Sequence, residues 1–427
     1  MKIYFNSVGC RLNQSEIERL SNQFRMAGHE IAHSVEESDL VVINTCTVTS
    51  AAAADSRRLT RQAYRRNPKA RIVLTGCWST LEREDAQKFP GVIQVIDNSE
   101  KDQLVEHILN LHENEVFLEP TVRYPLHGRR ARTRAFIKVQ DGCDNKCTFC
   151  ITTIARGDAR SVPHDRVILE VQAAAAAGIQ EIVLTGVQLT AYGKDRMDEY
   201  NLETLVRSIL THTEIPRLRL SSLEPWEIER GFLQLWEDPR VCRQLHLPLQ
   251  SGSTTTLRRM GRPITPQAYA DLISEAREKI PSVAITTDIL VGFPGENESE
   301  FEQSISFIKE MHFARAHVFS YSPRPGTPAF RLPQRVPVEI SRKRNKIVRD
   351  TVAKSSLKYR ESFLGKKLTA LWENATPLDE NNWELRGLTD NYLRVRAIAS
   401  SNLWNRLSPI RILTVEEKEL FTEILHR

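Results

Sequence analysis

Three cysteines stand close together in the middle of the chain, in a C-x3-C-x2-C arrangement formed by Cys143, Cys147 and Cys150. Three thiolates at this spacing can hold three irons of a [4Fe–4S] cluster and leave the fourth iron open. An open position is what substrate binding at a metal requires, whereas zinc sites usually present four ligands grouped in C-x2-C pairs. The spacing therefore favours an iron–sulfur cluster over a structural zinc site or inert thiols.

A second group of cysteines is spread over the first part of the chain. Cys10, Cys46 and Cys77 each end an apolar run that predicts a strand. The carboxyl ends of strands in an open parallel sheet line one crevice, so these three thiols are expected to converge on a second cluster. Asn13 and Asn44 flank them and are candidates to hydrogen-bond such a cluster or to shape its loop. The alternative is that each cysteine is a small buried apolar residue.

The elements around the second group predict an α/β domain over residues 1–115. Apolar runs at 2–8, 40–46, 71–77 and 92–97 indicate strands, and the stretches between them, of which 14–29 is the clearest, indicate helices. Continuous apolar strands separated by helices are typical of a parallel sheet that is covered on both faces. We expect an open parallel α/β sheet here, followed by a polar and basic linker at 116–134.

A second strand–helix series surrounds the C-x3-C-x2-C group. Six strands are predicted at 135–140, 181–186, 217–223, 245–250, 284–293 and 314–322, with helices at 164–177, 202–212, 225–237, 265–280 and 298–312. Six units are too few for a closed eightfold barrel, so we expect a partial (β/α)6 barrel over 132–362. Catalytic groups of βα barrels lie at the carboxyl ends of the strands, where the motif falls.

The last part of the chain changes character after a basic helix near 338–363. Short alternating segments with polar turns predict a small all-β barrel over 363–427. Its aromatic and basic residues suit RNA binding by stacking and charge, although the aromatics can equally form the core of the barrel. The residues in question are Trp372, Trp383, Tyr392, Arg394 and Arg396.

Composition restricts the class of protein. Of the 427 residues, 41% are hydrophobic and 26% are charged, as in a globular protein. No apolar run spans a membrane and no secretory signal is visible at the start, so we expect no membrane partner and a cytoplasmic location. In that compartment the seven cysteines are not expected to form disulfides, and the grouped ones are expected to bind a metal or a cluster. Cys242 fits neither group and is interpreted as structural.

The net charge of +5 decides little, but its distribution is informative. Dense basic clusters suit contact with phosphate, and the alternative is that they are solvated helix faces. Three clusters stand out: Arg57, Arg58, Arg61, Arg65, Arg66, Lys69 and Arg71; then Arg129, Arg130, Arg132 and Arg134; and finally Arg342, Lys343, Arg344, Lys346 and Arg349.

The C-x3-C-x2-C motif resembles that of the radical S-adenosylmethionine (SAM) superfamily. This resemblance implies that the open iron binds the amino and carboxylate groups of SAM, and that electron transfer cleaves SAM to a 5′-deoxyadenosyl radical. Phe149, the aromatic residue before the last cysteine of the motif, would then pack near the adenine. The protein would orient and protect the radical.

The segments 9–16 (GCRLNQSE), 44–48 (NTCTV), 75–77 (TGC) and 155–161 (ARGDARS) resemble the radical SAM methylthiotransferase family, over essentially the full chain. The resemblance implies a second [4Fe–4S] cluster on Cys10, Cys46 and Cys77 that carries sulfur, and a C-terminal TRAM domain. One SAM would methylate the sulfur and a second would supply the radical. Joining these half-reactions requires two open irons that face one cavity.

Polar or glycine positions at predicted strand ends match parts of this fold that contact SAM. Arg156, just beyond the motif, is expected either to face substrate or SAM or to hold its loop. The candidate SAM-binding residues, besides Phe149, are Thr185, Gly186, Gln188, Ser222, Glu224, Gln250 and Gly292.

The family modifies either an adenosine next to the anticodon of tRNA or an aspartate of a ribosomal protein. Segments 9–16 and 221–225 are more similar to the branch that acts on N6-threonylcarbamoyladenosine, so we expect methylthiolation of C2 of that base. Segment 151–154 departs from the family pattern beside the active site, which keeps N6-isopentenyladenosine open. The expected partners are tRNA, a flavodoxin- or ferredoxin-type reductant and a sulfur donor. An iron–sulfur RNA-binding sensor without turnover is the non-enzymatic alternative.

Overall fold

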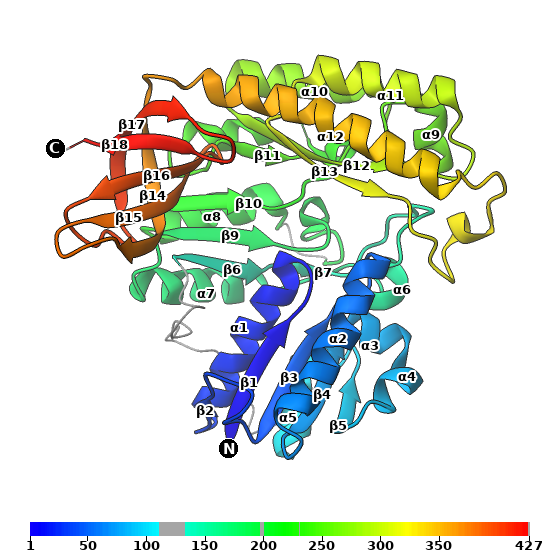
Figure 1. Ribbon diagram of the computed structural model, residues 1–427, viewed down its shortest axis with the longest axis vertical. Helices are drawn as coiled ribbons and strands as arrows, with labels where there is room; N and C mark the ends of the chain where they lie inside the picture. The colour runs from blue at the N-terminus through cyan, green and yellow to red at the C-terminus, as the bar shows by residue number, and fades with distance from the viewer. Residues whose placement is uncertain (111–132, 197–199, 230, 426–427) are drawn as a thin grey trace.

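The N-terminal domain is the open parallel α/β sheet that the sequence predicts (Figure 1). The structure is a computed structural model that describes residues 1–110, 133–196, 200–229 and 231–425. Five parallel strands lie in the order β2-β1-β3-β4-β5. They are β1 (Lys2–Ser7), β2 (Glu30–Ile31), β3 (Leu40–Thr45), β4 (Arg71–Gly76) and β5 (Val92–Ile96).

Helices cover both faces of this sheet because successive strand residues alternate between two apolar layers. Val42 packs in one layer with α1 (Arg11–Met26) and α5 (Leu104–Leu109). Val41 packs in the other with α2 (Ser50–Arg66) and α3 (Cys77–Leu81), beside α4 (Arg83–Gln87). The helix α1 begins directly after Cys10, three residues before the predicted start, so a candidate ligand is its N-cap residue.

The central domain is an open barrel of six strands. One parallel sheet has the order β10-β9-β6 and the other β11-β12-β13, and isolated parallel bridges Leu218–Val241 and Ser222–His246 join them. Since β6 and β13 end this series, the barrel stays open between them. The strands are β6 (Arg134–Lys138), β9 (Glu181–Thr185), β10 (Arg217–Leu220), β11 (Gln244–His246), β12 (Ala284–Val291) and β13 (Arg315–Ser320).

The outer layer of the barrel consists of α7 (His164–Ala176), α8 (Leu202–His212), α10 (Pro266–Lys279) and α11 (Glu298–Met311). Shorter elements are α6 (Thr152–Arg156), α9 (Thr254–Arg259) and the pair β7 (Gln140–Asp141) and β8 (Arg160–Ser161). The prediction of a helix at 225–237 is wrong. Two 3-10 helices stand there, Pro225–Glu227 and Phe232–Glu237, because Gly231 adopts φ +92°, which an α-helix does not allow.

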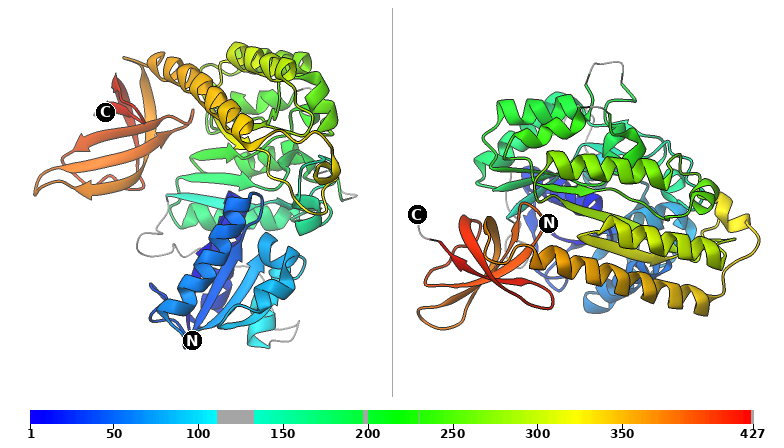
Figure 2. Two further views of the ribbon diagram at one scale, coloured as in Figure 1. Left: turned by 45° about the vertical axis from the view of Figure 1, so that its right-hand side comes forward. Right: turned by 90° about the horizontal axis from the view of Figure 1, so that it is seen from above.

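The long helix α12 (Val338–Glu361) runs beside β13 and leads into a closed C-terminal barrel (Figure 2). The barrel order is β14-β15-β16-β18-β17, which confirms the predicted small all-β domain. Its strands are β14 (Lys367–Pro377), β15 (Trp383–Thr389), β16 (Arg394–Ala399), β17 (Leu407–Val415) and β18 (Leu420–Ile424). The prediction of an RNA-stacking role is wrong for Trp372, which is fully buried and donates from Nε1 to Ser408 at 3.0 Å.

The C-terminal barrel docks against the amino ends of the central strands. Arg217 on β10 donates to the backbone oxygens of Leu388 and Thr369, at 3.0 and 2.6 Å. Arg243 forms a two-pronged ion pair with Asp390, at 2.6 and 3.1 Å. These buried and partly buried contacts hold the small barrel on the larger one.

Several predictions concern residues outside the described part of the chain. They are the linker, apart from its last two residues 133 and 134, and three members of the second basic cluster, Arg129, Arg130 and Arg132. The fourth member, Arg134, begins β6 and pairs with Glu373 at 2.6 Å. Among the described residues, no helix is long and apolar enough to cross a membrane.

Candidate functional site

The first three cysteines follow three neighbouring strands at the same edge of the N-terminal sheet. Cys10 lies three residues beyond β1, and Cys46 and Cys77 directly follow β3 and β4. Because Thr45 pairs with Gly76, the two later cysteines leave the sheet side by side. The loop that bears Cys10 comes so close to them that a Cβ on Gly9 would lie 2.7 Å from Sγ of Cys46. The structure therefore brings these predicted ligands together.

The electrostatics of Cys10 and Cys46 reflect their burial and the charges near them. Burial raises the pKa of Cys46 to about 11, and negative charge on Cys10 or Cys77 raises it further. Burial also raises the pKa of Cys10, against which the cation of Arg156 acts. At neutral pH such thiols stay protonated until a metal displaces the proton, because a coordinating thiol is deprotonated outright.

Two asparagines hydrogen-bond the sulfurs of this group. The Cys10 thiol lies 3.6 Å from Oδ1 of Asn13, a contact that the sequence suggests. Nδ2 of Asn98 lies 3.7 Å from Sγ of Cys77 and donates to the backbone oxygen of Ala155 at 2.7 Å. Sequence reasoning missed Asn98, although it follows β5 at the same edge of the sheet. Its strand-end position was the available signal.

The C-x3-C-x2-C loop follows β7 and packs against the segment after α9. Thr148 donates from its backbone N to Met260 O at 2.9 Å and from Oγ1 to Arg259 O at 2.8 Å. Gly261 is required for this close packing, because a Cβ there would lie 2.6 Å from the backbone oxygen of Lys146. The loop geometry is thus fixed by backbone contacts on both sides of the central cysteine.

Burial raises the pKa of Cys143 to about 12 and that of Cys147 to about 11. The sulfurs of this trio act on one another electrostatically, and the guanidinium of Arg262 lowers the pKa of Cys147. Sγ of Cys150 lies 3.2 Å from Oγ1 of Thr152. Nothing in the sequence marks Arg262, which comes from the loop after α9 and approaches only in the fold.

Both trios fit a cluster better than a single ion. Within the described ranges, no three His, Cys, Asp or Glu side chains are placed to hold one metal ion. In a four-iron cluster each thiolate binds a different iron, so the sulfurs need not converge on a point. Beside the trio of the C-x3-C-x2-C loop, Nδ2 of Asn145 and Nε of Arg262 are buried with no hydrogen-bond partner among the described residues. Unsatisfied buried donors of this kind are expected where a polar ligand binds.

Three candidate SAM-binding residues, Thr185, Gly186 and Gln188, lie at the carboxyl end of β9. Thr185 ends β9 and is buried. A Cβ on Gly186 would lie 3.0 Å from Oε1 of Gln140, so only glycine fits there without displacing that side chain. Oε1 of Gln188 accepts from the Cys143 thiol at 3.1 Å. Gln188 thus contacts a candidate ligand directly.

The remaining candidates follow β10, β11 and β12. Ser222 pairs with His246 where the two sheets join. Glu224 forms an ion pair with Arg262 at 3.0 Å. Gln250 makes backbone hydrogen bonds to β12 in a left-handed conformation, and the N–H of Gly292 is taken by Glu296 at 2.7 Å. These four residues therefore lie at the same end of the barrel, and Gly292 makes its contact through its backbone N–H.

Phe149 lies in an aromatic cluster at this end of the barrel. Its ring meets Phe293 edge to face, with centroids 6.4 Å apart, and Phe293 meets Tyr321 at 5.4 Å. The cluster packs against Met260 and Leu290, on both sides of the loop. The apolar wall is therefore rigid, as a surface that supports a ring should be.

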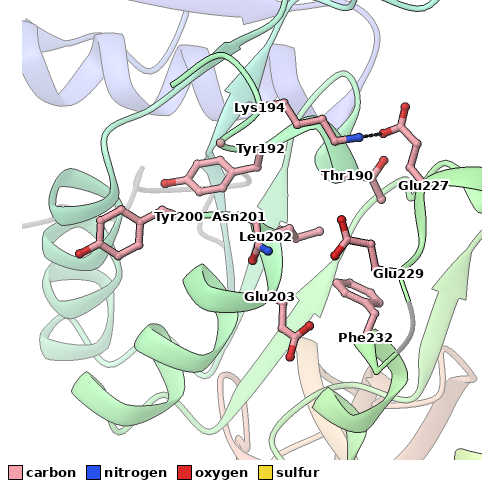
Figure 3. Close-up of a pocket in the computed structure, with 11 residues that line it drawn as sticks. Thr190, Tyr192, Lys194, Tyr200, Asn201, Leu202, Glu203, Glu227, Glu229 and Phe232 are labelled. Carbon is pink, nitrogen blue, oxygen red and sulfur yellow. Dashed lines mark hydrogen bonds and ion pairs between the residues drawn. The ribbon is translucent and has the colours of Figure 1, made fainter. Parts of the chain in front are cut away.

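A small cavity is lined by the segments that follow β9 and β10 and by the start of α8 (Figure 3). Its volume is about 230 Å³, and Lys194 and Glu227 form an ion pair of 2.9 Å at its rim. Glu227 also accepts from Nε2 of Gln188 at 2.6 Å. A chain of polar contacts therefore runs from Cys143 through Gln188 to the surface.

A buried charge network joins the two cysteine groups. Arg156 donates to Glu16 of α1 at 2.9 Å and to Asp141 of β7 at 2.8 Å, so it holds the loop, one of its two predicted roles. Glu16 also accepts from Lys101 and from Asn44, both at 2.8 Å. Burial would raise the pKa of Glu16, but the surrounding cations hold it well below its usual range. The N-terminal domain and the barrel are thereby fixed relative to each other.

The basic clusters remain candidates for phosphate contact. Arg57, Arg61 and Arg65 lie along one side of α2 and line a groove with Trp78 and Phe89. In α12 the cluster divides, since Arg344 is buried against Glu296 at 2.9 Å whereas its neighbours Arg342, Lys346 and Arg349 line a groove beside β13.

Family models match both parts that carry cysteines. One described as the radical SAM superfamily matches residues 137–308, and one described as uncharacterized protein family UPF0004 matches residues 2–97. Among solved structures, the radical SAM methyltransferase TsrM from Kitasatospora setae aligns with a TM-score of 0.59 over 77% of each chain. At 15% identity this likeness shows the fold alone. Fold and thiol loop together define a radical SAM protein.

Relatives of known name cover nearly the whole chain. Proteins named threonylcarbamoyladenosine tRNA methylthiotransferase MtaB are 34% identical in Bacillus subtilis (96% of this chain, 93% of that protein) and 36% identical in Aquifex aeolicus (93% and 96%). A protein named tRNA-2-methylthio-N(6)-dimethylallyladenosine synthase, from Geobacillus kaustophilus, is 30% identical (100% and 82%). The chain belongs to the methylthiotransferase family of radical SAM enzymes and is a transferase.

Proposed function

We propose that this chain adds a methylthio group to C2 of N6-threonylcarbamoyladenosine next to the anticodon of tRNA. The observation that carries the proposal is the pairing of two thiol trios, each at the carboxyl ends of parallel strands and joined through Arg156. The names of the relatives at 34–36% identity over nearly the full chain support this base. The dimethylallyl alternative rests on relatives at 29–30% identity.

In this proposal Cys143, Cys147 and Cys150 hold one [4Fe–4S] cluster. Cys10, Cys46 and Cys77 hold the other. When bound, the clusters and SAM supply sulfur, a methyl group and the one-electron chemistry that activates an unreactive C–H bond. Three thiolates per trio leave one iron of each cluster free for these ligands.

The chain itself positions the reactants. Phe149, in its rigid aromatic wall, supports the adenine of SAM. Thr185, Gly186, Gln188, Ser222, Glu224, Gln250 and Gly292 line the same mouth. Arg262 stands between Glu224 and Cys147, with 3.0 Å to the carboxylate and 4.0 Å to the sulfur. A fixed cation beside a thiolate cluster favours the added negative charge of the reduced state.

Two further partners follow from the chemistry. Radical formation needs one electron, which we assign to a flavodoxin- or ferredoxin-type protein, and each turnover consumes sulfur, which a separate donor must replace. Seven free thiols and a tRNA substrate support a cytoplasmic location.

The test is nucleoside mass spectrometry of tRNA from a deletion strain, complemented with variants of the gene. Wild type is expected to restore 2-methylthio-N6-threonylcarbamoyladenosine, whereas Cys10→Ala and Cys147→Ala are not. Cys242→Ala is the matched control, because this cysteine is buried outside both trios. Restoration of the dimethylallyl product instead would reassign the base.

Iron content separates the two sites in the purified protein. Wild type should hold about eight irons per chain, and Cys10→Ala about four. Incubation of the wild-type protein with SAM and a strong reductant should release 5′-deoxyadenosine. Absence of that product would contradict the proposed enzymatic function and would favour an iron–sulfur RNA-binding sensor.

A further inference from the structure

The inner wall of β13 carries a cation and two rings into the open barrel. Strand residues alternate between faces, and Ala316 and Val318 pack against the core of the barrel. His317 and Phe319 therefore face the interior, and Arg315, at the start of the same row, also lines the groove beside α12. The rings of His317 and Phe319 are stacked with centroids 6.4 Å apart, and Phe319 is 40% exposed. This wall is a flat aromatic surface with a guanidinium at one end.

A second cation reaches the same space from the N-terminal domain. Arg11, the first residue of α1, donates from Nη2 to the hydroxyl of Tyr392 at 2.7 Å. Burial would raise the pKa of Tyr392, but Arg11 and three further arginines, Arg315 among them, lower it. Both Arg11 and Arg315 also act electrostatically on His317. Arg11 and Arg315 therefore lie near the same two side chains, Tyr392 and His317, although they come from different domains.

The positive charges near Tyr392 and His317 are not equally compensated. Arg219 has a two-pronged ion pair with Glu181, at 2.7 and 3.1 Å. Within the described part of the chain, Arg11 has a hydrogen bond only to the hydroxyl of Tyr392, and Arg315 has no hydrogen bond or ion pair.

We propose that Arg11 and Arg315 bind the carboxylate of the threonylcarbamoyl substituent while the adenine stacks on the wall formed by His317 and Phe319. This inference rests on the proposed function and extends it to the residues that select the base. A guanidinium matches a carboxylate with two parallel hydrogen bonds, and aromatic side chains stack on bases without regard to sequence.

The position of Arg11 gives this binding a second effect. Arg11 directly follows Cys10 in the sequence, so a carboxylate bound by Arg11 brings the base close to a candidate cluster ligand. Unmodified adenosine and the dimethylallyl base lack the anion, and both leave the two cations uncompensated. The site therefore binds these bases less tightly because they lack the carboxylate, and not because they clash with the protein.

The test compares two anticodon stem–loops that differ only in the threonylcarbamoyl group. Dissociation constants are measured for each RNA with the iron-loaded full chain, as wild type, Arg315→Gln and Arg11→Gln. Wild type should prefer the modified RNA, and each variant should reduce that preference by about ten- to a hundredfold, the worth of a hydrogen bond between charged groups. Arg207→Gln, in an exposed ion pair of α8, is the matched control and should keep the preference.

Arg315→Gln is the cleaner variant, because Arg11 adjoins a cluster ligand; iron content checks that both variants keep their clusters. Tyr392→Phe removes the hydrogen bond that orients Arg11 and should reduce the preference less than Arg11→Gln does. An equal loss for both RNAs, with a shallower salt dependence, would show that the bound anion is a backbone phosphate and would overturn the assignment. Unchanged binding in both arginine variants would also overturn it. If wild type itself shows no preference, the proposed function fails instead.

Discussion

Replacing Glu16 with glutamine should destabilise the junction between the N-terminal domain and the barrel. The Glu16 carboxylate accepts hydrogen bonds from Arg156, Lys101 and Asn44, at 2.8–2.9 Å. A glutamine of the same shape keeps one acceptor and turns its Nε2 donor toward the other donors. Arg156 bonds one carboxylate oxygen and Lys101 and Asn44 share the other, so one or two bonds are lost, according to the orientation of the amide. Each is worth about 1.5–3 kcal/mol when a charged group takes part, so the free energy of unfolding should fall by about 1.5–6 kcal/mol.

Urea titration of the iron-loaded protein near neutral pH measures this loss. Glu203→Gln is the matched control: it removes a carboxylate that pairs with Arg207 on the surface of α8, and should cost less than about 1 kcal/mol. If Glu16→Gln costs no more than the control, the network does not hold the domains together.

The pH dependence of this difference has a defined sign. The pKa of Glu16 lies below its ordinary value of 4.5 in the folded protein, so its contribution to stability is complete above that value. It is lost as the pH falls through the folded pKa. Wild type and Glu16→Gln should therefore differ fully at neutral pH and converge in acid.

Two further predictions concern the thiols. Gly9→Ala should lower the iron content from about eight to about four per chain, because the new Cβ would lie 2.7 Å from Sγ of Cys46 and the residue has φ +107°. Gly28→Ala is the control and should keep its iron, because this residue has φ +79° and no atom lies within 4 Å of its Cβ. Equal iron content in both variants would contradict the steric argument. In iron-free protein, alkylation of Cys46 and Cys143 should be slow at about pH 8 and still rise beyond about pH 10, since burial raises their pKa values to about 11 and about 12; a plateau near pH 9 would refute this.

The convergence of the cysteines could be predicted because topology alone produces it. Once the runs before Cys46 and Cys77 are interpreted as parallel strands, their ends must meet at one edge of the sheet, and the register confirms that they do. The same reasoning explains why the barrel residues from Thr185 to Gly292 lie at one mouth. Periodicity and strand ends carry this information locally.

The cations that complete the site could not be predicted in this way. Arg11 and Tyr392 are 381 positions apart, and Arg262 reaches Cys147 from a loop 115 positions away. Such contacts depend on how three domains dock, which no local pattern encodes. The aromatic residues of the C-terminal barrel show the same limit: Trp372 fills its core whereas Tyr392 faces another domain, although both occur in short alternating segments.

The first two turns of α1 touch all three domains at once. Cys10 is the N-cap residue of the helix, Ser15 donates to the backbone oxygen of Phe136 in the barrel at 2.8 Å, and Arg11 donates to Tyr392 of the small barrel. Because these residues share one rigid helical segment, a chimera that exchanges any single domain with a relative would have mismatched partners on this helix. Functional exchange should require α1 and the turn that bears Tyr392 to be transplanted as a pair.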